Sequence, residues 1–348
     1  MLYISCTLSA GKGGSTVYPA DRLPPPLNRK RNDIPEQDTL GGLDLKRFVI
    51  LPLLWAGFLS PGELAAGAWT LPRGDFWGKV TYLKQSTNQE YVSSSGQGRP
   101  PDPAVHYFPG DRARYRFDGQ YSSWAVFLDL FYGITDRFDV GIQVPFLRQE
   151  FVDDALLTGF GEPRRATGFS DVRGILKFRA IREPFIGTLK LGVKVPTGQF
   201  LNKDGIIPVG EGQWDFEVIL QAGRSFWPIP AYANAEIGYR LRLKNDEIDR
   251  DPGDEWIFLG EVGANPAKRI LVALRLEGIR GKRATVIGLS NPSTIKRVTY
   301  LSPTVALGPF GNTSVEFALQ ISLNGHNFPA GQMLIAGVYY SGNPFRRR

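Results

Sequence analysis

Residues 168–179 read GFSDVRGILKFR, and charged and uncharged side chains alternate along them. Asp171, Arg173, Lys177 and Arg179 fall on odd-numbered positions, and apolar residues or glycine fall between them. Because successive side chains of a strand point to opposite faces, the stretch predicts a strand with one charged and one apolar face. A soluble sheet with one solvated face alternates in the same way. The number of such strands and their connections must therefore decide the fold.

Twelve segments from Trp69 onward show this alternation, and none shows a convincing helical period. The predicted strands are 74–86, 119–133, 137–148, 168–180, 186–198, 212–225, 231–243, 255–265, 269–280, 296–308, 313–324 and 331–341. Long loops rich in Gly, Pro and Asp follow the odd-numbered segments, and tight turns follow the even-numbered ones. Bacterial outer-membrane barrels have an even strand number, short periplasmic turns and longer extracellular loops. They are closed because hydrocarbon tolerates no unpaired sheet edge.

The sequence therefore predicts an all-β fold, a transmembrane antiparallel up-and-down β-barrel of about 12 strands in the bacterial outer membrane. A secreted soluble β-sandwich is the alternative, although it needs no alternation of short and long loops.

The strand AYANAEIGYRLRL at 231–243 separates the two faces of the predicted barrel. Glu236, Arg240 and Arg242 lie on one side, and Ile237 and Leu241 lie on the other. Charge on the lipid-facing side costs about 2–4 kcal/mol at the membrane midplane, so the charged side is expected to face the lumen. Aromatic residues near the strand ends, Tyr232 and Tyr300 among them, are expected to form interfacial girdles.

Residues 46–68 have the pattern of a secretory signal peptide. Lys46 and Arg47 supply the positive charge, 48–59 the apolar core, and 66–68 (Ala-Gly-Ala) the cleavage site. The apolar run is short for a transmembrane helix, which is the alternative interpretation. We expect three parts: a non-native N-terminal extension at 1–44, a signal peptide at 45–68 and an outer-membrane barrel at 69–348. A disordered native extension is the alternative for the first part.

The amino-acid composition excludes several kinds of site. The single cysteine, Cys6, lies ahead of the predicted cleavage site, so a disulfide framework and a thiol nucleophile are excluded from the expected mature protein. The net charge of +7 does not predict a nucleic-acid partner, because Lys and Arg are spread among Asp and Glu. We expect no metal site and no cofactor.

Several phrases together resemble a known family. They are LDLFYGITDRFDVGIQVPF, GFSDVRGILKFRA, LGVKVPTGQF with VGEGQWDFEVILQAGRSF after it, and AYANAEIGYRLR. This combination resembles the outer-membrane transporters named for the meta-pathway of phenol degradation, clearly over about 119–243 and weakly beyond. The resemblance implies a barrel that passes small, often aromatic or apolar, molecules, and it brings no set of catalytic or binding residues. Barrels of this class usually end on an aromatic residue, whereas eight residues follow Tyr340 here.

A channel or transporter without enzymatic activity is therefore the predicted function. A lipid-modifying barrel enzyme and a structural or assembly barrel are the alternatives. The two histidines, His106 and His326, fall in predicted loops, with no serine placed beside either on a strand. The expected partners are outer-membrane lipid, lipopolysaccharide, a small-molecule solute and the barrel-assembly machinery.

The predicted solute path is a set of charged lumen residues on neighbouring strands. The set comprises Arg173, Lys177, Lys190, Lys194, Asp215, Glu217, Glu236 and Arg240. The four leading cations form a basic sector, and Asp215 and Glu217 follow on the next strand. Ion pairing between these sectors and contact with an anionic solute remain alternatives.

Overall fold

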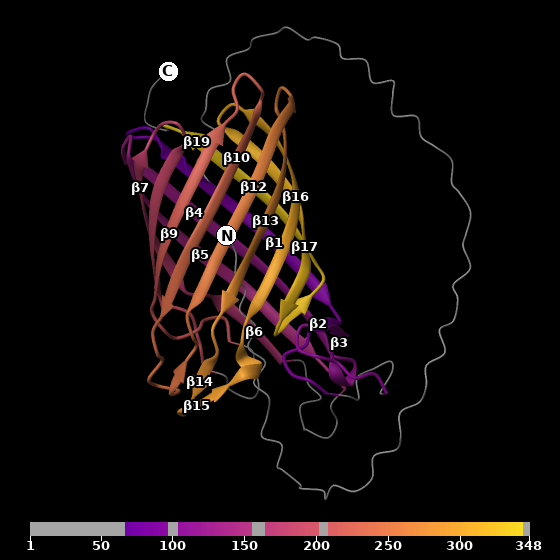
Figure 1. Ribbon diagram of the computed structural model, residues 1–348. Helices are drawn as coiled ribbons and strands as arrows, with labels where there is room; N and C mark the ends of the chain where they lie inside the picture. The colour runs from indigo at the N-terminus through magenta and orange to yellow at the C-terminus, as the bar shows by residue number, and fades with distance from the viewer. Residues whose placement is uncertain (1–66, 97–103, 155–163, 202–207, 344–348) are drawn as a thin grey trace, which may run out of the picture. The chain divides into compact units, whose positions relative to one another are not determined.

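The computed structural model describes residues 67–96, 104–154, 164–201 and 208–343. Almost all regular structure in these residues is antiparallel strand (Figure 1). The long strands are β1 (Phe76–Thr87), β4 (Gln120–Thr135), β5 (Phe138–Val152), β7 (Val172–Ile181), β8 (Ile186–Val195), β9 (Asp215–Ser225), β10 (Ala231–Arg242), β12 (Glu255–Ala267), β13 (Ile270–Gly281), β16 (Arg297–Phe310), β17 (Thr313–His326) and β19 (Gln332–Gly342). Shorter elements are β2 (Gln89–Tyr91), β3 (Arg112–Arg114), β6 (Arg164–Phe169), β11 (Arg250–Asp251), β14 (Ala284–Val286), β15 (Leu289–Asn291), β18 (Phe328–Ala330) and the 3₁₀ turns η2 (Arg116–Asp118) and η4 (Pro292–Thr294).

The twelve long strands of the described chain close into a barrel. Each pairs antiparallel with the next long strand in sequence, and β1 pairs with β19 from Phe76↔Gly342 to Gln85↔Met333 to complete the circle. All backbone groups along the wall therefore have a neighbour, as a hydrocarbon environment requires. The predicted up-and-down barrel is confirmed, and its strand boundaries agree with the expected ones to within a few residues.

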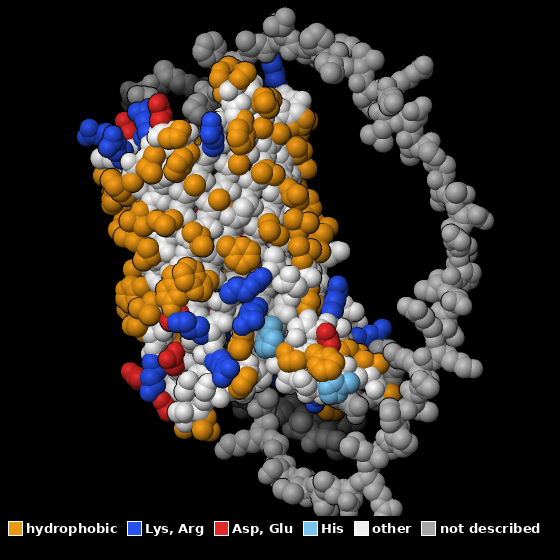
Figure 2. Space-filling view, in the orientation of Figure 1, with side chains coloured by type: hydrophobic (Ala, Val, Ile, Leu, Met, Phe, Trp, Pro, Cys, Tyr) orange, Lys and Arg blue, Asp and Glu red, His pale blue; other side chains and the backbone are white. Residues whose placement is uncertain are grey.

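The two faces of the wall differ in chemistry as the alternation predicted. Most exposed outward-facing residues along the middle of the wall are apolar, for example Leu220 at 61%, Val262 at 55% and Phe317 at 56%. Figure 2 shows hydrophobic side chains over the face of the wall that is in view, with most Lys, Arg, Asp and Glu side chains toward its two ends. Of the charged residues of the opening stretch, Asp171 and Lys177 are buried on the inner face.

The segment predicted as one strand at 168–180 is two strands, β6 and β7. They are separated at Ser170 and Asp171, where the register against β5 shifts by one residue: Phe146 lies opposite Phe169 of β6, whereas Gln143 lies opposite Arg173 of β7. Two small sheets lie at the long-loop end: β18-β2-β3 and β11-β14-β15. Their strands fall in segments where the sequence predicted only loops.

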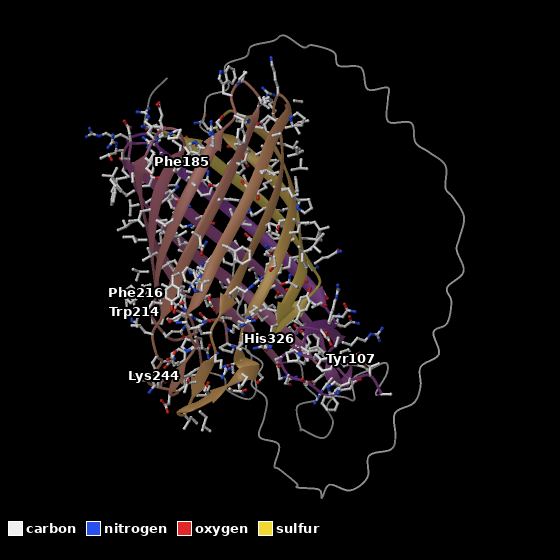
Figure 3. The ribbon with its side chains drawn as sticks, viewed as in Figure 1. Tyr107, Phe185, Trp214, Phe216, Lys244 and His326 are labelled. Atoms are coloured by element: carbon white, nitrogen blue, oxygen red, sulfur yellow. The ribbon has the colours of Figure 1, made fainter. Side chains whose placement is uncertain are left out.

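Two of the predicted girdle aromatics face the lumen instead. Tyr232 and Tyr300 are each 7% exposed. Tyr232 lies two residues from Asn234 and four from Glu236 on the same strand, so its side chain faces the lumen with theirs. Tyr300 packs in the buried cluster at the long-loop end. Position near a strand end does not determine the face, which depends on parity alone. Trp214, Phe216 and Phe185 do face outward near the strand ends (Figure 3).

The predicted extension at 1–44 and nearly all of the predicted signal peptide lie outside the described residues. Within the described residues, no helix is long and apolar enough to cross a membrane.

Candidate transport path

The end of the lumen at the short turns is occupied by the segment Gly67–Leu71. The Lys177 ammonium donates to the carbonyl oxygens of Gly67 at 2.7 Å and Trp69 at 2.6 Å. The Leu71 amide donates to the Asp139 carboxylate at 3.1 Å, and the Ala68 amide donates to Asn234 Oδ1 at 3.2 Å. Polar and charged side chains of the wall thus hold the backbone of this segment inside the lumen through hydrogen bonds.

Trp69 anchors the same segment by packing. Its ring meets Tyr232 edge to face, with centroids 6.1 Å apart. A Cβ atom at Gly223 would lie 2.8 Å from the indole, so glycine is required for this close approach. Thr188 also donates to the Ala68 carbonyl.

The middle of the lumen holds a cavity of about 170 Å³. Six of its charged lining residues form ion pairs between strands of the wall: Lys79 with Glu316 at 2.8 Å, Arg275 with Glu261 at 2.6 Å, and Lys190 with Glu236 at 3.0 Å. Aromatic and aliphatic side chains lie between these pairs: Trp77, Phe131, Leu259 and Ile335. The cavity therefore offers both apolar surface and hydrogen-bonding groups.

A network of ion pairs fills one side of the lumen toward the long-loop end. Lys194 Nζ lies 2.6 Å from Glu211, 3.0 Å from Asp215 and 3.2 Å from Asp171. Arg242 bonds Glu211 as well as Glu255, the latter at 3.0 Å. All members of this network except Glu211 are nearly inaccessible.

Glu211 ties a loop to this network. Its amide donates to Asp171 at 3.0 Å, and the amide of Gly198 donates to the same carboxylate at 3.0 Å. A Cβ at Gly210 would lie 2.6 Å from the carbonyl carbon of Gly198, so the two backbones touch directly.

Glu211 and Lys296 lie outside the barrel strands, and both have shifted pKa values. Burial alone would raise the pKa of Glu211, but Arg242, Lys194 and Lys296 outweigh it and hold this pKa well below its usual range. Burial lowers the pKa of Lys296 to about 8, although Glu211 opposes the shift. At neutral pH Glu211 is therefore ionised, and Lys296 is mostly protonated.

The other side of the long-loop end is packed with apolar side chains. Tyr91 of β2 and Phe328 of β18 enter a buried cluster with inward-facing residues of the wall. Its remaining members are Leu83, Ile257, Ile279, Val298, Tyr300, Ala330 and Met333. The Tyr91 hydroxyl donates to the Ser322 carbonyl at 3.0 Å, which fixes the small sheet over the lumen.

All eight residues predicted for the solute path lie on the inner face. Directly paired positions bring the basic sector together, with Lys177 opposite Lys190 and Arg173 opposite Lys194. Acids neutralise the sector on its other side, since Arg173 lies 3.4 Å from Glu217 and Lys194 contacts Asp215. Arg240 bonds Glu217 at 2.7 Å, and Glu236 bonds Lys190. Whether a solute contacts these residues stays a prediction.

Sequence reasoning missed the residues that close the lumen. Glu211 and Tyr91 lie in segments read as loop, and their chemistry alone gives no sign of an inward position. Residues 67–71 straddle the predicted cleavage site: Gly67 and Ala68 fall in the predicted signal peptide, and Trp69 to Leu71 fall in the predicted barrel. Cleavage after Ala68 would remove the contacts of Gly67 and Ala68 and keep those of Trp69 and Leu71. The Gly-Glu-Gly sequence at 210–212 was the available signal for a close backbone approach.

Neither histidine lies beside a nucleophile. His106 packs on the Phe108 ring with centroids 4.8 Å apart, and His326 Nδ1 lies 2.7 Å from the Ile295 carbonyl oxygen. Among the residues that the structure covers, no group of three or more His, Cys, Asp or Glu is arranged to hold a metal ion.

Solved structures with a similar fold include an outer-membrane channel from Pseudomonas putida F1. It has a TM-score of 0.63 and 15% sequence identity, and the match covers 82% of this chain and 100% of that one. A deletion mutant of the monoaromatic hydrocarbon channel TodX has a TM-score of 0.43 and 8% identity, covering 82% and 95% of the two chains. The toluene transporter TbuX of Ralstonia pickettii has a TM-score of 0.37 and 10% identity, covering 80% and 91%. No protein-family model matches the sequence, and none of the curated proteins matches it. The first structure shows that the fold is shared with an outer-membrane channel.

Proposed function

We propose that the protein is a bacterial outer-membrane channel for small molecules, with a lumen that the segment Gly67–Leu71 narrows at its periplasmic end. The observation that carries this proposal is the cavity of about 170 Å³ inside a closed wall whose outer face is apolar. An apolar exterior and a polar interior are the arrangement of a membrane barrel that encloses an aqueous path. The shared fold of the Pseudomonas putida outer-membrane channel supports the same function.

The cargo class that fits best is a single-ring aromatic molecule with a polar substituent, such as a phenol. A cavity of about 150 Å³ holds benzene in another protein, so about 170 Å³ is enough for one ring. Trp77 and Phe131 offer ring contacts, and the hydrogen-bonding groups around them suit a hydroxyl better than a bare hydrocarbon. The sequence resemblance to transporters of the phenol-degradation meta-pathway supports the same class.

Planar-bilayer conductance and liposome swelling test this function directly. Liposomes that contain the protein should swell faster in phenol than empty liposomes do. The same protein-containing liposomes should swell more slowly in a disaccharide than in phenol at the same concentration. Equal swelling in both solutes would contradict the cargo class. The absence of both conductance and swelling would contradict the channel. Hydrolysis of lipid in the same liposomes would favour the enzymatic alternative.

Ion selectivity is expected to be weak. Each lumen cation of the basic sector has an acidic partner or, for Lys177, backbone carbonyls, so no uncompensated field of one sign is expected along the path. The reversal potential in a potassium chloride gradient should therefore lie near zero. A strongly anion-selective potential would instead favour solute contact with Lys190 and Lys194.

The partners that this function requires are outer-membrane lipid along the apolar wall and a small solute in the lumen. Insertion by the barrel-assembly machinery belongs to the same proposal, and depletion of that machinery should abolish the heat-modifiable form of the protein in cells.

A further inference from the structure

Arg280 and Arg297 face each other on the outer wall, at the long-loop end of the barrel. They are directly paired residues of β13 and β16. Arg280 shares its parity with Leu276, and Arg297 shares its parity with Val305, two outward residues that are each 42% exposed. The two guanidinium groups therefore project from the same outer face, where the apolar wall ends.

The Arg280 side chain is held in place by its surroundings. Its Nη1 donates to the carbonyl oxygens of Ile279 at 2.8 Å and Val298 at 3.0 Å, and its Nη2 donates to Thr299 Oγ1 at 2.8 Å. The guanidinium carbon lies 5.2 Å from the centroid of the Phe258 ring. Three of its five N–H groups are engaged, so two remain for a ligand without a cost in ordering the side chain.

Neither arginine forms an ion pair with a carboxylate of the described chain. Like charges directly opposite each other on paired strands are destabilising, so this pair has a cost that an anion would relieve. Lys282 lies two residues beyond Arg280 and differs, because it bonds Asp254 at 3.1 Å and the Tyr239 hydroxyl at 2.8 Å. The lumen cations differ as well, since acids surround them.

A β-bulge between β16 and β17 brings His326 next to the two arginines. The register of β16 and β17 shifts between Thr299 and Tyr300, which places His326 opposite Arg297. Figure 3 labels His326 near the long-loop end of the wall, and Figure 2 shows several Lys and Arg side chains where the hydrophobic surface gives way to polar surface.

We propose that Arg280 and Arg297 bind a phosphate group of lipopolysaccharide, with its acyl chains along the apolar wall at Leu274 and Leu276. This inference rests on the proposed outer-membrane location, in which the long-loop end faces the outer leaflet. Two guanidinium forks match the geometry of a phosphate better than ammonium groups do. The pair also lies where an acyl chain on the wall would put its head group, because the exposed leucines begin four residues away along β13.

The test is binding of a deep-rough lipopolysaccharide to the full mature protein in detergent, with EDTA present and bound glycolipid counted by native mass spectrometry. The double variant Arg280→Gln with Arg297→Gln should bind about tenfold more weakly or worse, since charge-assisted hydrogen bonds are lost. The double variant Arg280→Lys with Arg297→Lys should keep part of the affinity. The control is Arg224→Gln, because Arg224 is also exposed on the outer wall but lies at the opposite end.

Unchanged binding by the double glutamine variant, in a protein that still shows heat-modifiable migration, would overturn the inference. Equal binding of the same glycolipid after removal of its phosphates would overturn it too, and so would full displacement by millimolar inorganic phosphate. Conductance is measured separately in bilayers without lipopolysaccharide. A protein that conducts but shows no arginine-dependent binding refutes this site alone, and one that binds but does not conduct refutes the channel alone.

Discussion

The two ends of the lumen are closed by different chemistry. At the short-turn end, fixed side chains such as Lys177 and Asp139 bind the backbone of residues 67–71. At the long-loop end, side chains of the wall and of one loop bind each other through ion pairs centred on Arg242 and Lys194. The first closure depends on one short segment that precedes β1, whereas the second is shared among several strands.

This difference predicts different consequences of damage. A segment held by a few hydrogen bonds can be released while the barrel stays intact, so changes at the short-turn end should alter conductance. A buried ionic network leaves uncompensated charges when one partner is removed, so changes at the long-loop end should alter stability. The closure at the short-turn end is thus the better candidate for control of the path.

The largest expected effect is on stability, from Arg242→Met. This change leaves Glu211, Asp215 and Glu255 without their shared cation, and breaking such a buried pair costs about 3–5 kcal/mol. The temperature at which the folded band disappears on a gel should fall clearly. Lys244→Met is the matched control, because its ion pair with Asp249 is exposed, and it should leave that temperature unchanged. An equal fall in both variants would mean that the network does not stabilise this end.

The next effect is on conductance, from Lys177→Met. The carbonyl groups of Gly67 and Trp69 lose the ammonium that binds both, and each such bond to a charged group contributes about 1.5–3 kcal/mol. We expect the single-channel conductance or the open fraction in planar bilayers to rise several-fold. Lys84→Met, on the exposed outer face of β1, should not change either quantity. A variant as closed as the wild type would show that the segment does not obstruct the path.

A smaller effect of the same kind is expected from Gly223→Ala. The added methyl group would lie 2.8 Å from the Trp69 ring and 3.1 Å from the Ala68 Cβ, so the segment must shift. Conductance should increase less than in Lys177→Met, because the hydrogen bonds remain. Gly174→Ala is the control, since nothing lies within 4 Å of its added Cβ. If the two alanine variants behave alike, Trp69 does not hold the segment in place.

The wall of the barrel was predictable from sequence because every residue of a strand must face either lipid or lumen, and a misplaced charge is costly. The parity of Lys177, Asp215 and Arg240 follows from this rule. The closures were not predictable, because the positions of Tyr91 and Glu211 depend on how loops fold back over the lumen. Tyr232 is a case where the sequence held the answer: its place near a turn predicted a girdle, but it lies an even number of residues from Glu236 on the same strand and therefore faces inward.

The smallest expected effect concerns Lys296, and pH can isolate it. Burial lowers its pKa from 10.5 to about 8, so between these values the unfolded chain binds more protons than the folded one. The free energy of unfolding gained from this group therefore rises with pH from about 8 to about 10.5, as the cost of burying its charge disappears. Glu211 behaves differently, because its pKa lies below the usual 4.5, and the stability that it contributes is lost only in more acidic solution.

Lys296→Met should accordingly unfold at a slightly higher denaturant concentration than the wild type at pH 7. Its free energy of unfolding should be larger by about 1 kcal/mol or less. Part of the relief is offset because Glu211, 3.8 Å away, loses one of its cations. The gap between the two proteins should close as pH rises above 8, since the wild-type lysine then becomes neutral in the folded state. Groups shared by both proteins cancel in this difference. A gap that stays constant from pH 7 to 10 would mean that Lys296 keeps its charge in the folded protein, and that this end of the lumen is wetter than its packing indicates.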